Sequence, residues 1–147
     1  MTATAMPQVQ AAIYAALSTD GTVSTLTTGV FDAIPQGQQV PYVVIGEFTE
    51  IPNKAFGNNG HELTATVHIY DQDGIPFKGV SARGAKRMLA ILDAVVTVLE
   101  AMGSAAVSGH TLVEVTYEFG APMREDDGNG GIYRHMPARF RVVLEDA

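Results

Sequence analysis

The sequence predicts an α+β fold, a mainly antiparallel four-stranded sheet with a short N-terminal helix and one long helix packed on one face. Two segments carry apolar residues at helical spacing, others alternate as half-buried strands do, and the elements run helix, strand, strand, helix, strand, strand. The 147 residues suffice for one core, and a hydrophobic fraction of 46% with 17% charged residues is typical of a folded globule. We therefore expect a single domain over residues 1–147.

The N-terminal part is expected to contain one helix and one strand before the first long loop. Apolar spacing predicts a helix over residues 7–17, with the proline tolerated in the first turn and Asp20-Gly21 signalling a turn after it. Residues 22–28, "TVSTLTT", are compatible with a loop or a brief helical turn, and periodicity does not decide between them. Residues 41–49 predict a strand, because tyrosine, valine and isoleucine follow a proline there.

The middle of the chain contains the clearest strand and the main helix. Residues 50–61, "EIPNKAFGNNGH", are predicted to be a long irregular hairpin connection, because proline, asparagine and glycine concentrate there. Residues 61–70 alternate between apolar and polar side chains, which predicts a strand with one buried face. Residues 80–102 predict the main helix, because apolar side chains recur at spacings of three and four.

Two further strands, over residues 111–119 and 131–144, complete the predicted sheet, with a second glycine-rich loop, "APMREDDGNGG", between them. If these strands pair, opposite charges face each other on the exposed side, and each pair contributes ~0.2–1 kcal/mol. The charged residues are Glu114 and Glu118 on one strand and Arg139 and Arg141 on the other.

Composition excludes several classes of protein. The 16 acidic and 9 basic side chains give a net charge of −7, which disfavours binding to a phosphate backbone. The absence of cysteine excludes disulfides, thiolate metal sites and cysteine nucleophiles. The first residues lack a signal-peptide pattern, and no run approaches the ~20 apolar residues of a membrane helix. We therefore expect a soluble, untargeted protein that binds neither membranes nor specific nucleic acid.

The sequence contains no motif that predicts catalysis or cofactor binding. "DQDG" (residues 71–74) and "EDDGNGG" (residues 125–131) lack the spacing of a calcium loop and are interpreted as solvated turns, with a weak divalent site at a subunit contact as the alternative. GxSxG, Walker and dinucleotide-binding patterns are missing, and the histidines show no metal-binding spacing. We therefore predict no catalytic residue, cofactor or metal. The four histidines are interpreted as ordinary surface or sheet residues; they are His61, His68, His110 and His135.

Arg83, Lys86 and Arg87 form the only basic cluster, on the first turns of the predicted main helix. One interpretation is a solvated helix face. The other is a docking patch for acidic residues of a neighbouring copy, such as Asp126 and Asp127, which the excess of carboxylates makes physically possible.

Several short motifs follow one another in a fixed order between residues 10 and 145. They are a valine-aromatic-Asp element with a following proline, a Pro-Tyr-Val-Val-Ile-Gly strand, a strand ending in His-Ile-Tyr, and an alanine-rich helix; their positions are Val30, Phe31, Asp32, Pro35, Pro41, Tyr42, Val43, Val44, Ile45, Gly46, His68, Ile69, Tyr70, Ala85 and Leu89. In this order they resemble a tailed-phage family, the tail terminator or tail-completion proteins of siphophages, whose relatives occur in prophages and gene transfer agents.

The resemblance implies a structural virion protein that carries out no reaction. It implies a hexameric ring that caps the completed tail tube, forms the joint to the head connector and stops tail elongation. The implied partners are further copies of the chain, the major tail tube protein and the head-tail connector protein, and DNA passes through the lumen. The implied location is the head-proximal end of the virion tail, after assembly in the host cytoplasm.

For such a ring, the proline-bracketed corner over residues 30–46 is expected to fix how the chain enters the sheet, which lowers the entropy lost on assembly. The polar loops at residues 51–61 and 122–131 are predicted to face the tube or the neighbouring subunit, because a head-to-tail contact needs two different complementary patches. The predicted interaction residues are Lys54, Phe56, Asn58, Asn59, Arg83, Lys86, Arg87, Arg124, Asp126 and Asp127.

Two alternatives to a tail terminator are compatible with the sequence. A head-completion or connector protein would bind the portal side and leave the tube to another protein. A small metal-dependent enzyme would use the carboxylate pairs Asp71/Asp73 or Asp126/Asp127.

Overall fold

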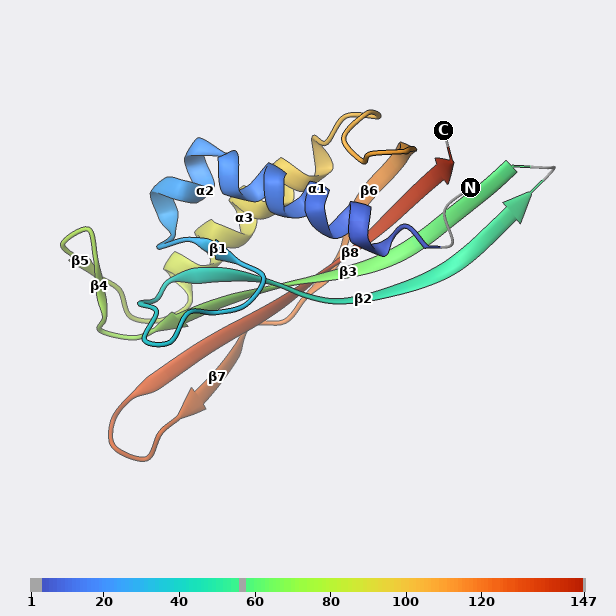
Figure 1. Cartoon of the computed structure of the whole chain (residues 1–147). Coiled ribbons are helices and arrows are strands. Elements are labelled where there is room, and N and C mark those ends of the chain that lie inside the picture. Colours follow the sequence, from blue (N-terminus) through green and yellow to red (C-terminus); the bar gives the residue numbers. More distant parts are fainter. Residues whose placement is uncertain (1–3, 56–57, 147) are drawn as a thin grey trace.

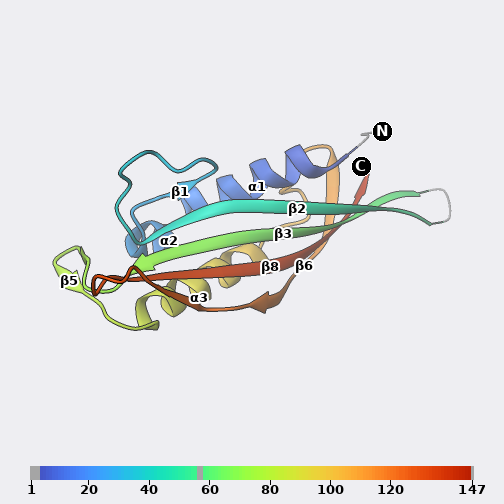
Figure 2. The same ribbon diagram turned by 90° about the horizontal axis from the view of Figure 1, so that it is seen from below.

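In the computed structural model, which describes residues 4–55 and 58–146, helices cover one face of a twisted sheet (Figure 1). Of the described residues, three segments form α-helices: α1 (Met6–Thr19), α2 (Gly21–Leu26) and α3 (Lys86–Glu100). Figure 2 shows the sheet from its other face, with the helices behind the strands. The predicted α+β class, with helices on one face, is therefore confirmed.

The sheet is larger and more mixed than predicted. Among the described residues it contains six strands, where four were expected. They are β1 (Val30–Phe31), β2 (Tyr42–Ala55), β3 (Asn58–Gln72), β6 (His110–Gly120), β7 (Met123–Asp126) and β8 (Ile132–Asp146). The order is β1-β2-β3-β8-β6, and β7 pairs with the first part of β8. The pairing of β1 with β2 is parallel and the other pairings are antiparallel.

The prediction of one long helix over residues 80–102 is wrong at its N-terminal end. Val80 belongs to a small separate hairpin of β4 (Pro76–Phe77) and β5 (Val80–Ser81), and α3 begins only at Lys86. Gly79 and Gly84 have φ values of 79° and 81°, the left-handed region that favours glycine and that a helix cannot contain. With 15 residues, α3 is almost matched by α1 with 14.

Most of the segment that periodicity left open, residues 22–28, belongs to the short helix α2, which begins one residue earlier, at Gly21, and ends at Leu26. Asp20 caps it, because its Oδ2 accepts a hydrogen bond from the backbone N–H of Val23 at 2.9 Å. The corner that follows is held by Thr28, whose hydroxyl donates to the carbonyl of Gln39 at 2.6 Å and whose N–H donates to the carbonyl of Pro41 at 2.8 Å. These contacts fix the entry into β2, as the proline-bracketed sequence predicts.

The core lies between the helices and the covered face of the sheet. The alternation predicted for residues 61–70 is confirmed, because every second side chain of β3 is buried, and β8 alternates in the same way. The apolar stripe predicted for the main helix is also present on α3. The largest fully buried side chains are Phe140, Ile13, Leu17, Leu63, Ile69, Met88, Ile91, Leu99, Met136, Leu144, Val9 and Val23.

Both predicted polar loops are mostly strand. The segment at 50–61 continues β2 and β3, which pair as far as Ala55 opposite Asn58, and the loop at 121–131 contains β7. The last pair between β3 and β8 is Gly60 opposite Glu145. The end of β2 after Asn53 and the start of β3 before Gly60 therefore extend past the three-stranded part of the sheet as a two-stranded ribbon (Figure 1). Proline and asparagine suggested a loop, but an antiparallel hairpin satisfies its own backbone groups along most of its length.

Candidate interaction surface

The long axis of the sheet gives the subunit two different ends. The β2–β3 ribbon projects at one end, close to both termini, whereas the β4–β5 hairpin and the turn between β7 and β8 lie at the other (Figures 1 and 2).

Within the described part of the chain, none of the helices is long and apolar enough to cross a membrane.

Residues of the Pro-Tyr and His-Ile-Tyr motifs come together on the open face of the sheet, where four rings form a row. Tyr42 and Tyr70 stack with centroids 5.3 Å apart, Tyr70 stacks on His135 at 4.4 Å, and His135 stacks on His68 at 4.9 Å. Stacked aromatic pairs on neighbouring strands contribute beyond the area they bury. The two motifs supply three rings and β8 supplies the fourth, so that an aromatic row (Tyr42, Tyr70, His135 and His68) lies on a face that no helix of the described chain covers.

Gly46 is needed next to this aromatic row because the ring of His68 lies over its backbone. A Cβ at Gly46 would collide with that ring, so any other residue would displace it. The ring is also held by hydrogen bonds: Nε2 of His68 donates to Glu47 at 2.9 Å, and its Nδ1 is hydrogen-bonded to Nε2 of His135 at 2.7 Å. The hydrogen bond from His68 lowers the pKa of Glu47, and burial followed by the nearby His68 lowers the pKa of His135.

A cleft of about 500 Å³ adjoins the aromatic row. Tyr42, Tyr70 and His135 form the part of its lining that comes from the row. Met123 and Tyr133 of the β7–β8 hairpin also line the cleft, and both are 46% exposed. The cleft is therefore lined in part by solvent-exposed apolar and aromatic side chains, which are typical of contact sites.

The predicted interaction residues of the first loop lie in the β2–β3 ribbon. Lys54 is opposite Asn59, and Asn58 is opposite Ala55, so they lie in the two-stranded ribbon beyond the sheet. Phe56 lies outside the described residues. The ribbon groups the predicted residues at one end of the subunit.

The predicted residues of the second loop lie in the β7–β8 hairpin, with two different roles. Arg124 lines the cleft and donates to Asp126 at 3.3 Å, and both side chains are exposed. Asp127 accepts from the backbone N–H groups of Asn129 at 2.7 Å and Gly131 at 2.9 Å. Asp127 therefore shapes the turn itself, and Asp126 is the carboxylate better placed for a partner.

The basic cluster divides into one internal and two exposed side chains. Arg87 donates from Nη2 to Oδ1 of Asp71 at 2.6 Å and from Nε to Oδ2 at 3.0 Å, and it also donates to the carbonyl of Ile75 at 3.0 Å. The interpretation of Arg87 as part of a solvated face or docking patch is therefore wrong, because this guanidinium is used within the subunit. Arg83 and Lys86 are exposed.

The interpretation of "DQDG" as a solvated turn is also wrong. Asp71 and Asp73 are only 3% and 8% exposed, and each pairs with an arginine. Arg134 donates from Nε to Asp73 at 2.7 Å, and this hydrogen bond, opposed in part by burial, lowers the pKa of Asp73. These two carboxylates anchor the turn after β3 to α3 and β8.

The Asp73–Arg134 pair predicts a dependence of stability on acidic pH. The pKa of Asp73 is lower in the folded chain than its ordinary value of 3.8, so the ionised carboxylate stabilises the fold at pH values above 3.8. This stabilisation is lost as the pH falls from there through the lower pKa of the folded state. Asp73→Asn is expected to cost about 1.5–3 kcal/mol near neutral pH and less below pH ~4. Urea unfolding across this range measures the difference between the two proteins. A difference in unfolding free energy that stays constant across this pH range would contradict the assignment. In an Arg134→Met background, Asp73→Asn should cost little stability, because the charge partner is already gone.

The predicted cross-strand ion pairs on the open face are present. Arg139 lies 3.6 Å from Glu118 and Arg141 lies 3.5 Å from Glu114. The paired charges are not on directly opposite residues, because the pairing of β6 with β8 shifts register between Leu112 and Glu114 and again between Tyr117 and Phe119. Arg141 also donates to Glu62 of β3 at 2.6 Å, which links three strands.

The four histidines form two pairs, and the interpretation of all four as ordinary surface or sheet residues is wrong for His61 and His110. His68 and His135 belong to the aromatic row, whereas His61 and His110 are buried beside Asp146. A signal for this burial exists in the sequence, because His61 is in phase with the buried positions of its strand, and Asp146 is in phase with those of β8. An imidazole or carboxylate in phase with a core stripe is a polar group that needs a buried partner.

Comparison with known proteins gives the fold and the family. No curated protein matches the chain. A chain in a solved structure described as "Virion of native gene transfer agent (GTA) particle" is similar with a TM-score of 0.75 over 98% of this chain and 99% of that chain, and at 21% sequence identity the likeness concerns the fold. The model of the family described as "Tail completion protein gp17" matches residues 11–145. The chain therefore belongs to the tail completion protein gp17 family and is a structural protein of a virion tail.

Proposed function

We propose that the protein assembles as a hexameric ring on the end of the finished tail tube, stops its elongation, and forms the joint to the head connector. The observation that carries this proposal is the presence of two different ends on one subunit, within a family of tail completion proteins. The β2–β3 ribbon at one end and the β4–β5 and β7–β8 elements at the other give a subunit that can contact different partners along its axis. A joint between tube and connector requires such an asymmetry.

Ring closure by a head-to-tail contact needs two unlike patches that fit each other. Arg83 and Lys86 are exposed near the start of α3, and Asp126 is exposed on β7. The N-terminal end of α3 and strand β7 both lie away from the β2–β3 ribbon, toward the other end of the subunit (Figure 1). We assign Arg83 and Lys86 of one subunit to contact Asp126 of its neighbour, because opposite charges at a polar rim set the register of an interface.

The net charge of −7 is compatible with a ring through which DNA passes. A negatively charged lumen repels phosphates, so the DNA does not adhere to the wall during passage. The proposed role requires shape and contact, and it includes no chemical step.

Charge reversal tests the proposed contact. The Arg83→Glu/Lys86→Glu variant and the Asp126→Lys variant are each expected to lower the fraction of capped tube ends at least ~10-fold, because like charges then meet across the interface. Combining the three changes is expected to restore much of the capping. Electron microscopy of polymerised tail tubes mixed with each variant measures the fraction.

Glu145→Lys, a reversal of the same kind at the other end of the subunit, is the matched control for ring contacts near α3. Normal capping by the Arg83→Glu/Lys86→Glu variant and by the Asp126→Lys variant would contradict this assignment. So would a failure to recover capping when the three changes are combined.

A further inference from the structure

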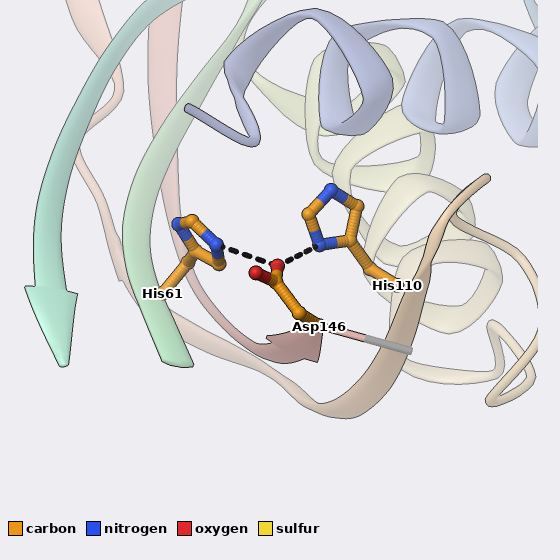
Figure 3. Close-up of side chains that lie close together, drawn as sticks. All are labelled: His61, His110 and Asp146. Atoms are coloured by element: carbon orange, nitrogen blue, oxygen red, sulfur yellow. Dashed lines mark hydrogen bonds and ion pairs between the residues drawn. The ribbon is translucent and has the colours of Figure 1, made fainter. Parts of the chain in front are cut away.

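Near the base of the β2–β3 ribbon, strands β3, β6 and β8 bring two histidines onto one carboxylate (Figure 3). His61 from the start of β3 and His110 from the start of β6 both point toward Asp146 at the end of β8. Nε2 of His61 lies 2.9 Å from Oδ1 of Asp146, and Nδ1 of His110 lies 3.1 Å from the same oxygen. The two histidines are 5% and 4% exposed, so the cluster is enclosed on the imidazole side.

The second nitrogen of His61 faces another carboxylate. Nδ1 lies 3.1 Å from Oε1 of Glu50, and that oxygen also accepts the backbone N–H of Ala5 at 2.7 Å. A neutral imidazole carries one proton, and if Glu50 accepts it from Nδ1, the lone pair on Nε2 is aimed at Asp146. In that arrangement the lone pair of Nε2 and an oxygen of Asp146 face each other at 2.9 Å, which is the geometry of two atoms that can bind one cation together.

We propose that His61, His110 and Asp146 bind a divalent transition-metal ion of the Zn²⁺ type. Zinc accepts imidazole nitrogen and carboxylate oxygen at ~2.0–2.2 Å in tetrahedral geometry, which places neighbouring ligand atoms ~3.3 Å apart. The observed separations of 2.9 and 3.1 Å are within a few tenths of an ångström of that edge, and all three ligand atoms lie within 4.8 Å of one another. The two contacts to Asp146 thus already have nearly the spacing of ligands on one ion, and binding would draw the two imidazole nitrogens around it.

The donor set selects the kind of metal. Two imidazole nitrogens suit zinc and its transition-metal neighbours, whereas calcium and magnesium prefer oxygen ligands. Glu50 holds Nδ1 of His61 in the way that carboxylates orient metal-binding histidines, which directs Nε2 to the ion. Asp146, with a side chain 16% exposed, provides the approach from solvent, and water completes the coordination. Glu50 is thus a positioning residue and the other three are ligands.

The ion would connect β3, β6 and β8 at the end of the sheet from which the β2–β3 ribbon projects. It would also compensate two carboxylates, Glu50 and Asp146, that lie against buried imidazoles. This inference does not depend on ring formation, and it can be tested on the isolated chain.

Calorimetric titration of the chelator-treated 147-residue chain with Zn²⁺ tests the site. We expect one ion per chain, a higher melting temperature with Zn²⁺, and a Co²⁺ form with the visible absorption of a four-coordinate site. His110→Gln keeps the size and a polar end but removes the ligand, so the one-ion stoichiometry is expected to be lost. Glu50→Gln is expected to weaken binding about 10- to 100-fold, as changes behind a ligand do.

His135→Gln is the matched control, because it removes a histidine of the other pair, and it is expected to bind Zn²⁺ as the unchanged chain does. X-ray absorption of the zinc-loaded chain, with two imidazoles in the first shell, keeps the test valid if His110→Gln fails to fold. Absence of Zn²⁺ binding by the unchanged chain overturns the proposal. So does binding that His135→Gln abolishes and His110→Gln leaves intact.

Discussion

Replacing Arg87 by methionine is expected to lower the free energy of unfolding by about 3–5 kcal/mol, because the change leaves a buried carboxylate without its charge partner. Arg87 and Asp71 form a two-point contact at 2.6 and 3.0 Å, and Asp71 is 3% exposed. The same guanidinium donates to the carbonyls of Ile75 and Val80, so its loss also frees the β4–β5 hairpin from α3. Urea unfolding, monitored by circular dichroism, measures the change.

Two variants separate the buried charge from other effects of the substitution. Lys86→Met, at the exposed neighbouring position, is expected to stay within ~0.5 kcal/mol of the unchanged protein. The double change Arg87→Met/Asp71→Leu removes both charges and is expected to recover part of the loss. A cost below ~1 kcal/mol for Arg87→Met would show that the pair is not the anchor inferred from the structure.

Shortening the β2–β3 ribbon is expected to abolish capping of tail tubes while leaving the subunit folded. Replacing residues 54–59 by Asn-Gly places a two-residue turn directly after the pair of Asn53 and Gly60, which preserves the register of both strands. Because β8 pairs with β3 only up to Gly60, the replaced residues lie outside the three-stranded part of the sheet. The free energy of unfolding should therefore change by less than ~1 kcal/mol.

Capping by this variant is measured by electron microscopy with polymerised tubes, and its fold by urea unfolding. We expect capped ends to fall at least ~10-fold, because the ribbon carries the polar tip assigned to the tube or the neighbour. A folded variant that caps tubes as the unchanged protein does would show that the ribbon makes no essential contact.

The periodic elements could be predicted from the sequence because burial alone determines them. β3 alternates along its length, and the stripe of α3 from Met88 to Leu99 follows the helical period, so their type and buried face were predictable. The start of α3 was misplaced because Val80 fits the same period by chance, while Gly84, in a left-handed conformation, ends that continuity. The strand β7 was missed because four exposed residues show no apolar pattern.

The roles of individual charged residues could be predicted less well, because they depend on contacts between distant segments. Nothing near Arg87 in the sequence shows that Asp71, 16 residues earlier, is buried beneath it. The cluster of His61, His110 and Asp146 likewise requires knowledge of strand order, since these residues meet only when β3 and β6 flank β8. The cross-strand ion pairs were predictable because pairing of the last two long strands alone brings them together.

Electron microscopy of the purified protein mixed with polymerised tail tubes tests the central claim most directly. The proposal predicts a ring of subunits on one end of each tube and no further growth of that end when more tube protein is added. Tubes that stay bare and continue to grow in the presence of the protein, or protein that binds the head connector alone, would contradict it.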